Sequence, residues 1–250
     1  MENTNQSNES QANNNPPKKS GVKKIILIII ILLAIAGVTG YFLAGNFNKK
    51  VGEIGVSVVG DSVAIVNGEK IAKSEFESRV GQNKEIAKSQ GVNLADEKTV
   101  KEIEKMTLDE MVNEKILLQD AKKKGLITPV ADVEKAYNEI FAKFKNKDDF
   151  TKELATQNLT EQSLKENITK QLTLIKYMEQ NVDSKNITVS EKEIGDLYKS
   201  LREKQKNIPK LEQIKTQIEN EIKQSKLKVK ILELIAKLKT GAKIEISAQF

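Results

Sequence analysis

An uncharged apolar run of twenty residues, Ile25 to Ala44, constrains this chain more than any other feature of its sequence. A helix rises about 1.5 Å per residue, so a run of this length spans the roughly 30 Å hydrocarbon core of a bilayer. We therefore predict a transmembrane signal anchor at residues 25–45. It divides the chain into a short tail, residues 1–24, a linker, residues 46–60, and a large charged domain, residues 61–250.

Lysines flank this run unequally. Four lie before it, whereas Lys49 and Lys50 follow it with Glu53 close behind. The positive-inside bias then predicts a single-pass protein of the cell membrane, with a cytoplasmic N-terminus and an extracytoplasmic C-terminal domain. The tail is almost free of apolar residues, and we expect it to be disordered. A cleaved signal peptide is the alternative, but the apolar run exceeds the roughly 7–15 residues usual for such a segment.

The chain has no histidine and no cysteine. Zinc hydrolases, Ser-His-Asp triads and histidine acid–base pairs all need an imidazole, so none of them can be built. No glycine-rich phosphate loop of the G-x-x-x-x-G-K or G-x-G-x-x-G type occurs. We therefore expect no catalytic residue, no cofactor and no metal. An enzyme of an unrecognised type is the weakest of the functional alternatives.

The net charge of +6 comes mostly from the lysines around the apolar run. Residues 51–250 hold 35 basic and 33 acidic side chains, which is not the excess of a nucleic-acid-binding protein. Within them, residues 51–198 carry a net charge of −5 and residues 199–250 a net charge of +7. Either these halves attract each other in the fold, which we favour, or the basic half faces anionic lipid or an anionic client.

Two short segments far apart in the sequence are predicted to form a small sheet. Residues 63–71, VAIVNGEKI, contain a β-branched run and Asn67-Gly68, which is the signal of a type I′ hairpin turn. Residues 243–246, KIEI, alternate as a strand does. This strand is predicted to add to the hairpin and to bring the ends of the domain together.

Apolar spacing of three and four predicts that helices fill the rest of the domain. Ser74 and Glu77 form a capping box, so the first helix should begin near Glu75 and run towards Gln90. Thr128 is predicted to cap a later helix, with Pro129 at its first position and Val130 in its apolar stripe. Further helices are predicted at 99–124, 149–156, from Thr160 to about 180, from Ser190 onwards, and from about 209 to 240. The fold class is therefore mainly α, with a small β-sheet formed by N- and C-terminal strands.

The order of these segments resembles the SurA/PrsA family of extracytoplasmic chaperones. The resemblance is carried by VAIVNGEKI, by LDEMVNEKILLQDAKKKGLITPVADVEKAY, by FTKELATQNLTEQSLKENITKQL and by ITVSEKEIGDLY, and it covers roughly residues 60–200 and 210–247. It implies a helical chaperone core. In full-length members a parvulin-type prolyl isomerase domain follows the last of these motifs. Here about ten residues separate Tyr198 from Pro209, so we expect no isomerase domain there and no isomerase activity, although family association favours that label.

The resemblance implies a membrane-anchored, ATP-independent holdase that binds unfolded or newly translocated polypeptides. The lipid bilayer would be contacted through residues 25–44. The alternative is a membrane-tethered structural adaptor for one dedicated envelope or secretion partner. Large apolar side chains at helical spacing are the candidate client contacts, although each one alone is more often part of a core. They are Phe76, Met106, Met111, Tyr137, Phe141 and Phe144.

Overall fold

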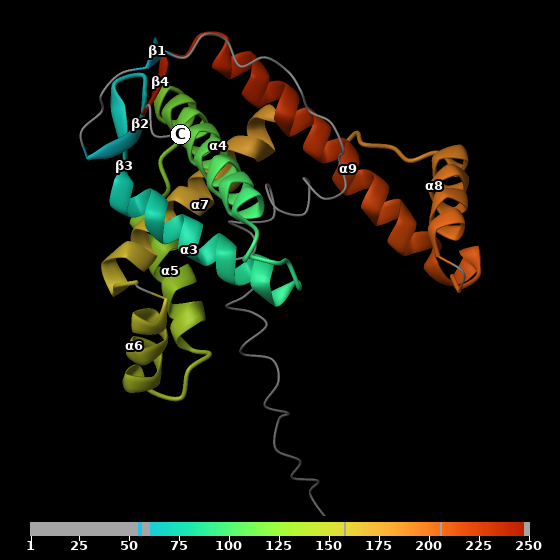
Figure 1. Cartoon of the computed structure of the whole chain (residues 1–250), viewed down its shortest axis with the longest axis horizontal. Coiled ribbons are helices and arrows are strands. Elements are labelled where there is room, and N and C mark those ends of the chain that lie inside the picture. The colour runs from blue at the N-terminus through green and yellow to red at the C-terminus, as the bar shows by residue number, and fades with distance from the viewer. Residues whose placement is uncertain (1–54, 57–60, 158, 206, 248–250) are drawn as a thin grey trace, which may run out of the picture.

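The computed structural model describes residues 55–56, 61–157, 159–205 and 207–247 (Figure 1). The predicted cytoplasmic tail and signal anchor lie outside the described residues. Within the described ranges, no helix is both long enough and apolar enough to cross a bilayer.

Four short strands form one mixed sheet in the order β1-β4-β2-β3. They are β1 (Gly55–Val56), β2 (Ser62–Val66), β3 (Glu69–Ala72) and β4 (Ile244–Ile246). The predicted hairpin is confirmed, because Asn67 and Gly68 have φ angles of 50° and 84°, which a type I′ turn requires. The C-terminal strand is confirmed too, since β4 pairs antiparallel with β2 and brings Glu245 opposite Ile65. The short strand β1, parallel to β4, lies in the segment that we interpreted as a linker.

Seven described helices follow the hairpin and precede β4. The N-caps of α7 and α8 were predicted correctly: Thr160 and Ser190 each accept a hydrogen bond from the backbone three residues later. The helices are α3 (Lys73–Ser89), α4 (Glu97–Lys123), α5 (Val130–Phe141), α6 (Lys147–Thr156), α7 (Glu161–Asn181), α8 (Glu191–Lys204) and α9 (Leu211–Lys239).

Two predicted N-caps were wrong. Helix α3 begins at Lys73 without a side-chain cap, because it follows β3 directly and the amide of Lys73 donates to the carbonyl of Asp61 at 2.9 Å. Ser74 therefore lies inside the first turn. Helix α5 has Pro129 as its N-cap, and the Thr128 hydroxyl is instead hydrogen-bonded to that of Thr173 on α7 at 2.7 Å. The same geometry leaves Val130 75% exposed, outside the buried stripe of α5.

Helix α4 lies at the centre of the larger part of the molecule, which we call the body (Figure 1). The body consists of the sheet, α3 to α7 and the C-terminal half of α9. Its first apolar cluster joins the sheet to α3 and α4, and its second joins α5, α6 and α7 around Phe150. A third cluster, around Tyr177 and Ile235, fastens α7 and α9 to α4.

The smaller part of the molecule is a pair of helices that we call the arm. It consists of α8 and residues 211–222 of α9, packed around Ile194, Ile218 and Ile222. Figure 1 shows α8 at the opposite end of the molecule from α6. The segment that joins α7 to α8, residues 182–190, is called the connector below. Helix α9 therefore belongs to both parts and links them.

Candidate functional site

Five of the six predicted client contacts belong to two apolar clusters of the body, and Met106 belongs to neither. Phe76 and Met111 are buried in the cluster beneath the sheet. Tyr137, Phe141 and Phe144 surround Phe150, and their ring centroids lie 5.7, 5.3 and 5.1 Å from its centroid. These are edge contacts of the kind that stabilise an aromatic core. Met106 is half-buried on α4.

None of these six residues is among the exposed large apolar side chains. Among the described residues those exposed side chains are Ile127, Val130, Ile175, Val229 and Leu232. Val229 and Leu232 lie three positions apart on α9 and are 52% and 42% exposed. Because residues three and four apart share one face of a helix, Ala236 extends the same exposed strip.

This strip exists because α9 has apolar residues on two opposite faces. In the arm, Ile218 and Ile222 face α8. In the body, Ile235 packs with Leu117 of α4 and Tyr177 of α7. At 3.6 residues per turn, Val229 lies two turns beyond Ile222 on the side that faces the arm, whereas Ile235 lies on the other side. The apolar face therefore continues beyond the part that α8 covers.

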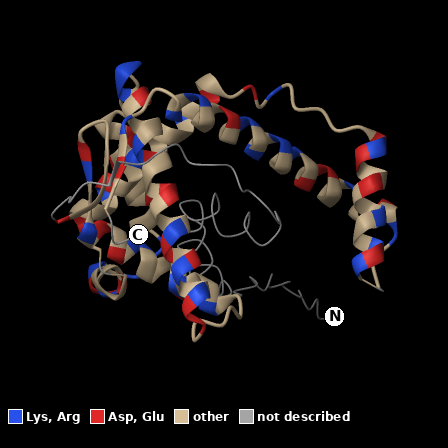
Figure 2. Cartoon of the chain, turned by 45° about the horizontal axis from the view of Figure 1, so that its top comes forward, with Lys and Arg blue, Asp and Glu red and all other residues tan. Residues whose placement is uncertain are grey.

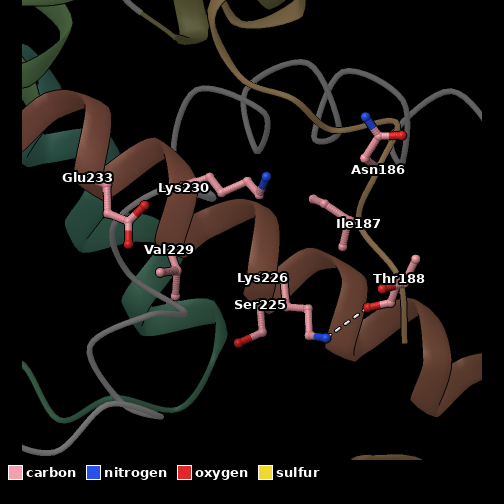
Figure 3. Close-up of a pocket in the computed structure, with 8 residues that line it drawn as sticks. All are labelled: Asn186, Ile187, Thr188, Ser225, Lys226, Val229, Lys230 and Glu233. Atoms are coloured by element: carbon pink, nitrogen blue, oxygen red, sulfur yellow. Dashed lines mark hydrogen bonds between the residues drawn. The ribbon is translucent and has the colours of Figure 1, made fainter. Parts of the chain in front are cut away.

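An open groove lies between this face of α9 and the connector (Figure 3). Its volume is about 400 Å³. Ile187 of the connector and Val229 of α9 supply its apolar side chains. The other lining residues are Asn186, Thr188, Ser225, Lys226, Lys230 and Glu233.

Lys226 fastens the connector to α9. Its ammonium donates to the carbonyl oxygen of Thr188 at 2.7 Å and lies 2.6 Å from Oε1 of Glu193 in α8. The hydrogen bond from Lys226 comes first among the causes that lower the pKa of Glu193 to about 2, and those from the backbone and hydroxyl of Ser190 come next. The groove therefore has one fixed wall, which is built on the N-terminus of α8.

Positive charge predominates on the part of α9 that forms the groove. Residues 222–239 contain six lysines and one glutamate, a net charge of +5, and Figure 2 shows basic residues recurring along α9. Lys230 takes part in no ion pair among the residues that the structure describes. In Figure 3 its side chain extends towards the connector, whereas the carboxylate of Glu233 points away from it.

A buried polar group lies elsewhere, between α3 and α4. Burial raises the pKa of Glu110 to about 7, against the opposing effects of Arg79 and Asn83 on α3. Neither carboxylate oxygen of Glu110, nor Oδ1 of Asn113, has a hydrogen-bond partner among the described residues. No group of acidic side chains in the described part of the chain could hold a metal ion. Glu110 therefore bears on stability, and the groove is the candidate site considered below.

Sequence reasoning missed Val229, Leu232 and Ile187 as candidates. The available signal was the number of apolar residues in α9, since its buried and exposed apolar positions together occupy more than one face. A helix with one partner needs a single apolar stripe, so a second stripe indicates a second partner or an exposed surface.

The chain belongs to the family of SurA-like N-terminal domains, whose model matches residues 14–178. It is distantly related to PrsA foldases and SurA chaperones. It is 36% identical to the foldase protein PrsA of Caldanaerobacter subterraneus over 90 residues, which are 33% of this chain and 29% of that protein. It is 26% identical to the foldase protein PrsA of Clostridium kluyveri over 200 residues, 73% of this chain and 59% of the relative. The chaperone SurA of Hahella chejuensis is 29% identical over 145 residues, 57% of this chain and 32% of the relative.

These matches leave much of each relative uncovered, since the chain spans between about a third and three fifths of the length of these curated proteins. No solved structure matches the chain significantly.

Proposed function

We propose that this protein is a membrane-anchored, extracytoplasmic chaperone that holds unfolded or newly translocated polypeptides without ATP. The observation that carries the proposal is an open, partly apolar groove on a chain of the SurA-like N-terminal domain family. The names of its relatives, foldase and chaperone, agree with this role. The sequence has no nucleotide-binding motif, which supports binding and release without ATP.

Unfolded chains expose apolar side chains that are covered in their native states. The strip of Val229 and Leu232 can cover such side chains and be covered by them, at about 25 cal/mol per Å² of apolar surface removed from water. A contact of this size is weak and reversible, so a client is released when it folds. Met106, Tyr137, Phe141 and Phe144 are partly exposed and stay candidates for additional contacts.

Membrane attachment at residues 25–44 is part of the proposal. Tethering raises the local concentration of the chaperone around a chain that emerges from the membrane, so weak contacts are sufficient.

We further propose that binding is not accompanied by prolyl isomerisation. Residues 205–210 alone join α8 to α9, and the Tyr198 hydroxyl donates to the carbonyl of Pro209 at 3.0 Å. A connection of six residues therefore stands at the position where the family resemblance would have placed a parvulin domain. Isomerisation of an X-Pro test peptide above the uncatalysed rate would contradict this part of the proposal.

Aggregation suppression tests the binding function. The full chain is reconstituted in phosphatidylcholine nanodiscs, and light scattering of two unrelated denatured proteins is followed after dilution without ATP. Near-stoichiometric suppression of both proteins is expected, and empty nanodiscs should have no effect. Failure with both, by a chain shown to be folded, would contradict a chaperone and favour an adaptor with a single partner.

A matched pair of double variants tests the site. Val229→Ser with Leu232→Ser removes the two large side chains of the exposed strip of α9, and Ile127→Ser with Val130→Ser removes two apolar side chains of the body that are even more exposed. Covering a half-exposed Val or Leu is worth roughly 1 kcal/mol, so the first variant should bind clients about tenfold more weakly. The second should behave as the unmodified protein does. Equal losses of client affinity in both variants would show that the groove is not the client-binding site.

A further inference from the structure

The charge around the groove points to the kind of segment that it accepts. Lys226 is already bonded to the Glu193 carboxylate and the Thr188 carbonyl, so its role is to hold the connector against α9. Lys230 lies one turn further along α9, lines the same groove and extends towards the connector (Figure 3). Among the described residues its charge acts at longer range on Asp183, whose pKa is lowered mainly by a hydrogen bond from Asn186. The ammonium of Lys230 is therefore available to a ligand.

The lysines of this part of α9 lie on both sides of the exposed strip. At 3.6 residues per turn, Lys226 and Lys230 fall on one side of Val229, and Lys228 falls on the other. Glu233 is the single acidic residue within residues 222–239. A segment that places an apolar side chain on Val229 would therefore have lysines next to its flanking residues.

We infer that the groove between the connector and α9 selects extended polypeptide segments in which apolar residues are flanked by aspartate or glutamate, with Lys230 as the residue that recognises the carboxylate. This inference rests on the proposed chaperone function and names the class of client segment bound. The apolar side chain lies against Ile187 and Val229. The neighbouring carboxylate pairs with Lys230, which has no other ion-pair partner among the described residues.

The shape of the site favours a peptide over a lipid surface. A groove of about 400 Å³ is near the lower end of the roughly 300–1,000 Å³ of ligand pockets, which is space for a few side chains. Because the connector forms one wall, the groove is concave, and a flat bilayer would not reach Ile187 at its side. Helices that lie on membranes also present broader apolar faces with larger side chains than the strip formed by Val229, Leu232 and Ala236.

The test uses three fluorescent peptides that share one apolar core and differ only in four flanking residues, which are all glutamate, all glutamine or all lysine. Binding to the full chain in phosphatidylcholine nanodiscs is measured by fluorescence anisotropy at low and at high salt. We expect the glutamate peptide to bind best, by about twofold to fivefold over the glutamine peptide for one exposed ion pair. High salt should reduce this advantage, because it screens exposed charges.

Two charge-matched variants identify the residue. Lys230→Gln should remove the preference for the glutamate peptide and leave binding of the glutamine peptide unchanged. Lys152→Gln, an exposed lysine of α6 without an ion pair in the described structure, removes the same charge and should retain the preference. Circular dichroism of both variants checks that each is folded.

The outcomes separate the inference from the proposed function. If all three peptides bind equally well, the chaperone function stands and the charge selectivity is wrong. If aggregation suppression and peptide binding are both absent, the proposed function itself is wrong. If the glutamate preference is absent and Lys230 is instead required to capture vesicles that contain phosphatidylserine, the face belongs to a membrane and the inference is overturned.

Discussion

The body and the arm are built from similar amphipathic helices, yet they bury very different amounts of apolar surface. Ten buried residues form the cluster beneath the sheet, six, including Phe150, form the second cluster, and four join α4, α7 and α9. The arm buries three, Ile194, Ile218 and Ile222. Regions with few buried apolar contacts open at a lower free energy than the rest of a protein. The arm is therefore expected to unfold locally while the body stays folded.

The two regions also differ in how they meet the groove. The C-terminal half of α9 is the part of the body that lines the groove, and the connector supplies the other lining residues. The groove thus lies where α9 leaves the body and enters the arm. Of the five large apolar side chains exposed among the described residues, two, Val229 and Leu232, lie where this long helix changes its packing partner. A small movement of the arm there would change the width of the groove.

The largest expected effect concerns the aromatic cluster of the body. Phe150 is 1% exposed and is contacted by Tyr137, Phe141 and Phe144. Phe150→Ala should lower the free energy of unfolding by about 3–5 kcal/mol, because it leaves a cavity among three rings. Phe150→Leu, which keeps most of the volume, should cost less than about 1.5 kcal/mol. Urea denaturation followed by circular dichroism measures both. Similar values for the two variants would show that this cluster is not tightly packed.

The second prediction tests directly whether the body and the arm unfold separately. Ile218 and Ile235 are the same residue type on the same helix, but Ile218 is buried in the arm and Ile235 in the body. Each change to Ala should lower the free energy of unfolding by about 2–4 kcal/mol. Ile218→Ala should speed hydrogen exchange in α8 and leave α4 unchanged, whereas Ile235→Ala should speed exchange in α4. The same exchange pattern in both variants would show that the two regions unfold as one unit.

The third prediction is a gain of stability in the body. Burial raises the pKa of Glu110 from 4.5 to about 7, so the folded state binds its proton more tightly than the unfolded state does. Stability from this group is therefore present below pH 4.5 and is lost as the pH rises towards 7. Glu110→Gln should stabilise the protein by about 2–3 kcal/mol at pH 8 and by much less at pH 4. Thermal unfolding at the two pH values measures the difference. An equal effect at both would contradict a carboxyl group whose pKa is raised by burial.

Local signals in the sequence were sufficient for most of the secondary structure. Asn67-Gly68 is enough to predict its turn, because both residues tolerate positive φ, and hydrogen bonds of Asn67 with Gln119 and Lys243 then hold the turn in place. The side chains of Ser190 and Glu193 each accept a hydrogen bond from the other's backbone amide, and this local pair defines the start of α8. Pairing of β4 with β2 was predictable as well, since only one other segment of the domain had a clear strand pattern.

Signals that depend on tertiary packing could not be read in this way. Thr128 has the sequence of an N-cap, yet its hydroxyl is used by Thr173 of a helix more than forty residues away. Phe76 and Met111 look like candidate contacts because they are large and apolar, and the sheet covers them. Val229 and Leu232 look like core residues, and nothing in the described structure covers them fully. Which apolar face of a helix remains exposed depends on the length of its neighbours, and α8 ends its packing on α9 before residue 229 is reached.

The smallest expected effect is the loss of stability when a helix cap is removed, and it can be compared between the arm and the body. Ser190 caps α8 in the arm together with Glu193, and Thr160 caps α7 in the body together with Ser163. Loss of a capping hydroxyl costs about 1 kcal/mol, so Ser190→Ala and Thr160→Ala should destabilise the protein similarly at pH 7.

Acid should separate these two variants. The pKa of Glu193 is lowered from 4.5 to about 2 by Lys226 first and then by Ser190, so its contribution is present above pH 4.5 and is lost as the pH falls towards 2. The penalty of Ser190→Ala should therefore shrink between pH 7 and pH 3, whereas that of Thr160→Ala should stay constant, because no carboxyl group takes part in its capping box. Urea denaturation at both pH values measures the two penalties. A constant penalty for Ser190→Ala would mean that Glu193 does not couple the cap of α8 to Lys226, and that the wall of the groove is held by the Thr188 carbonyl alone.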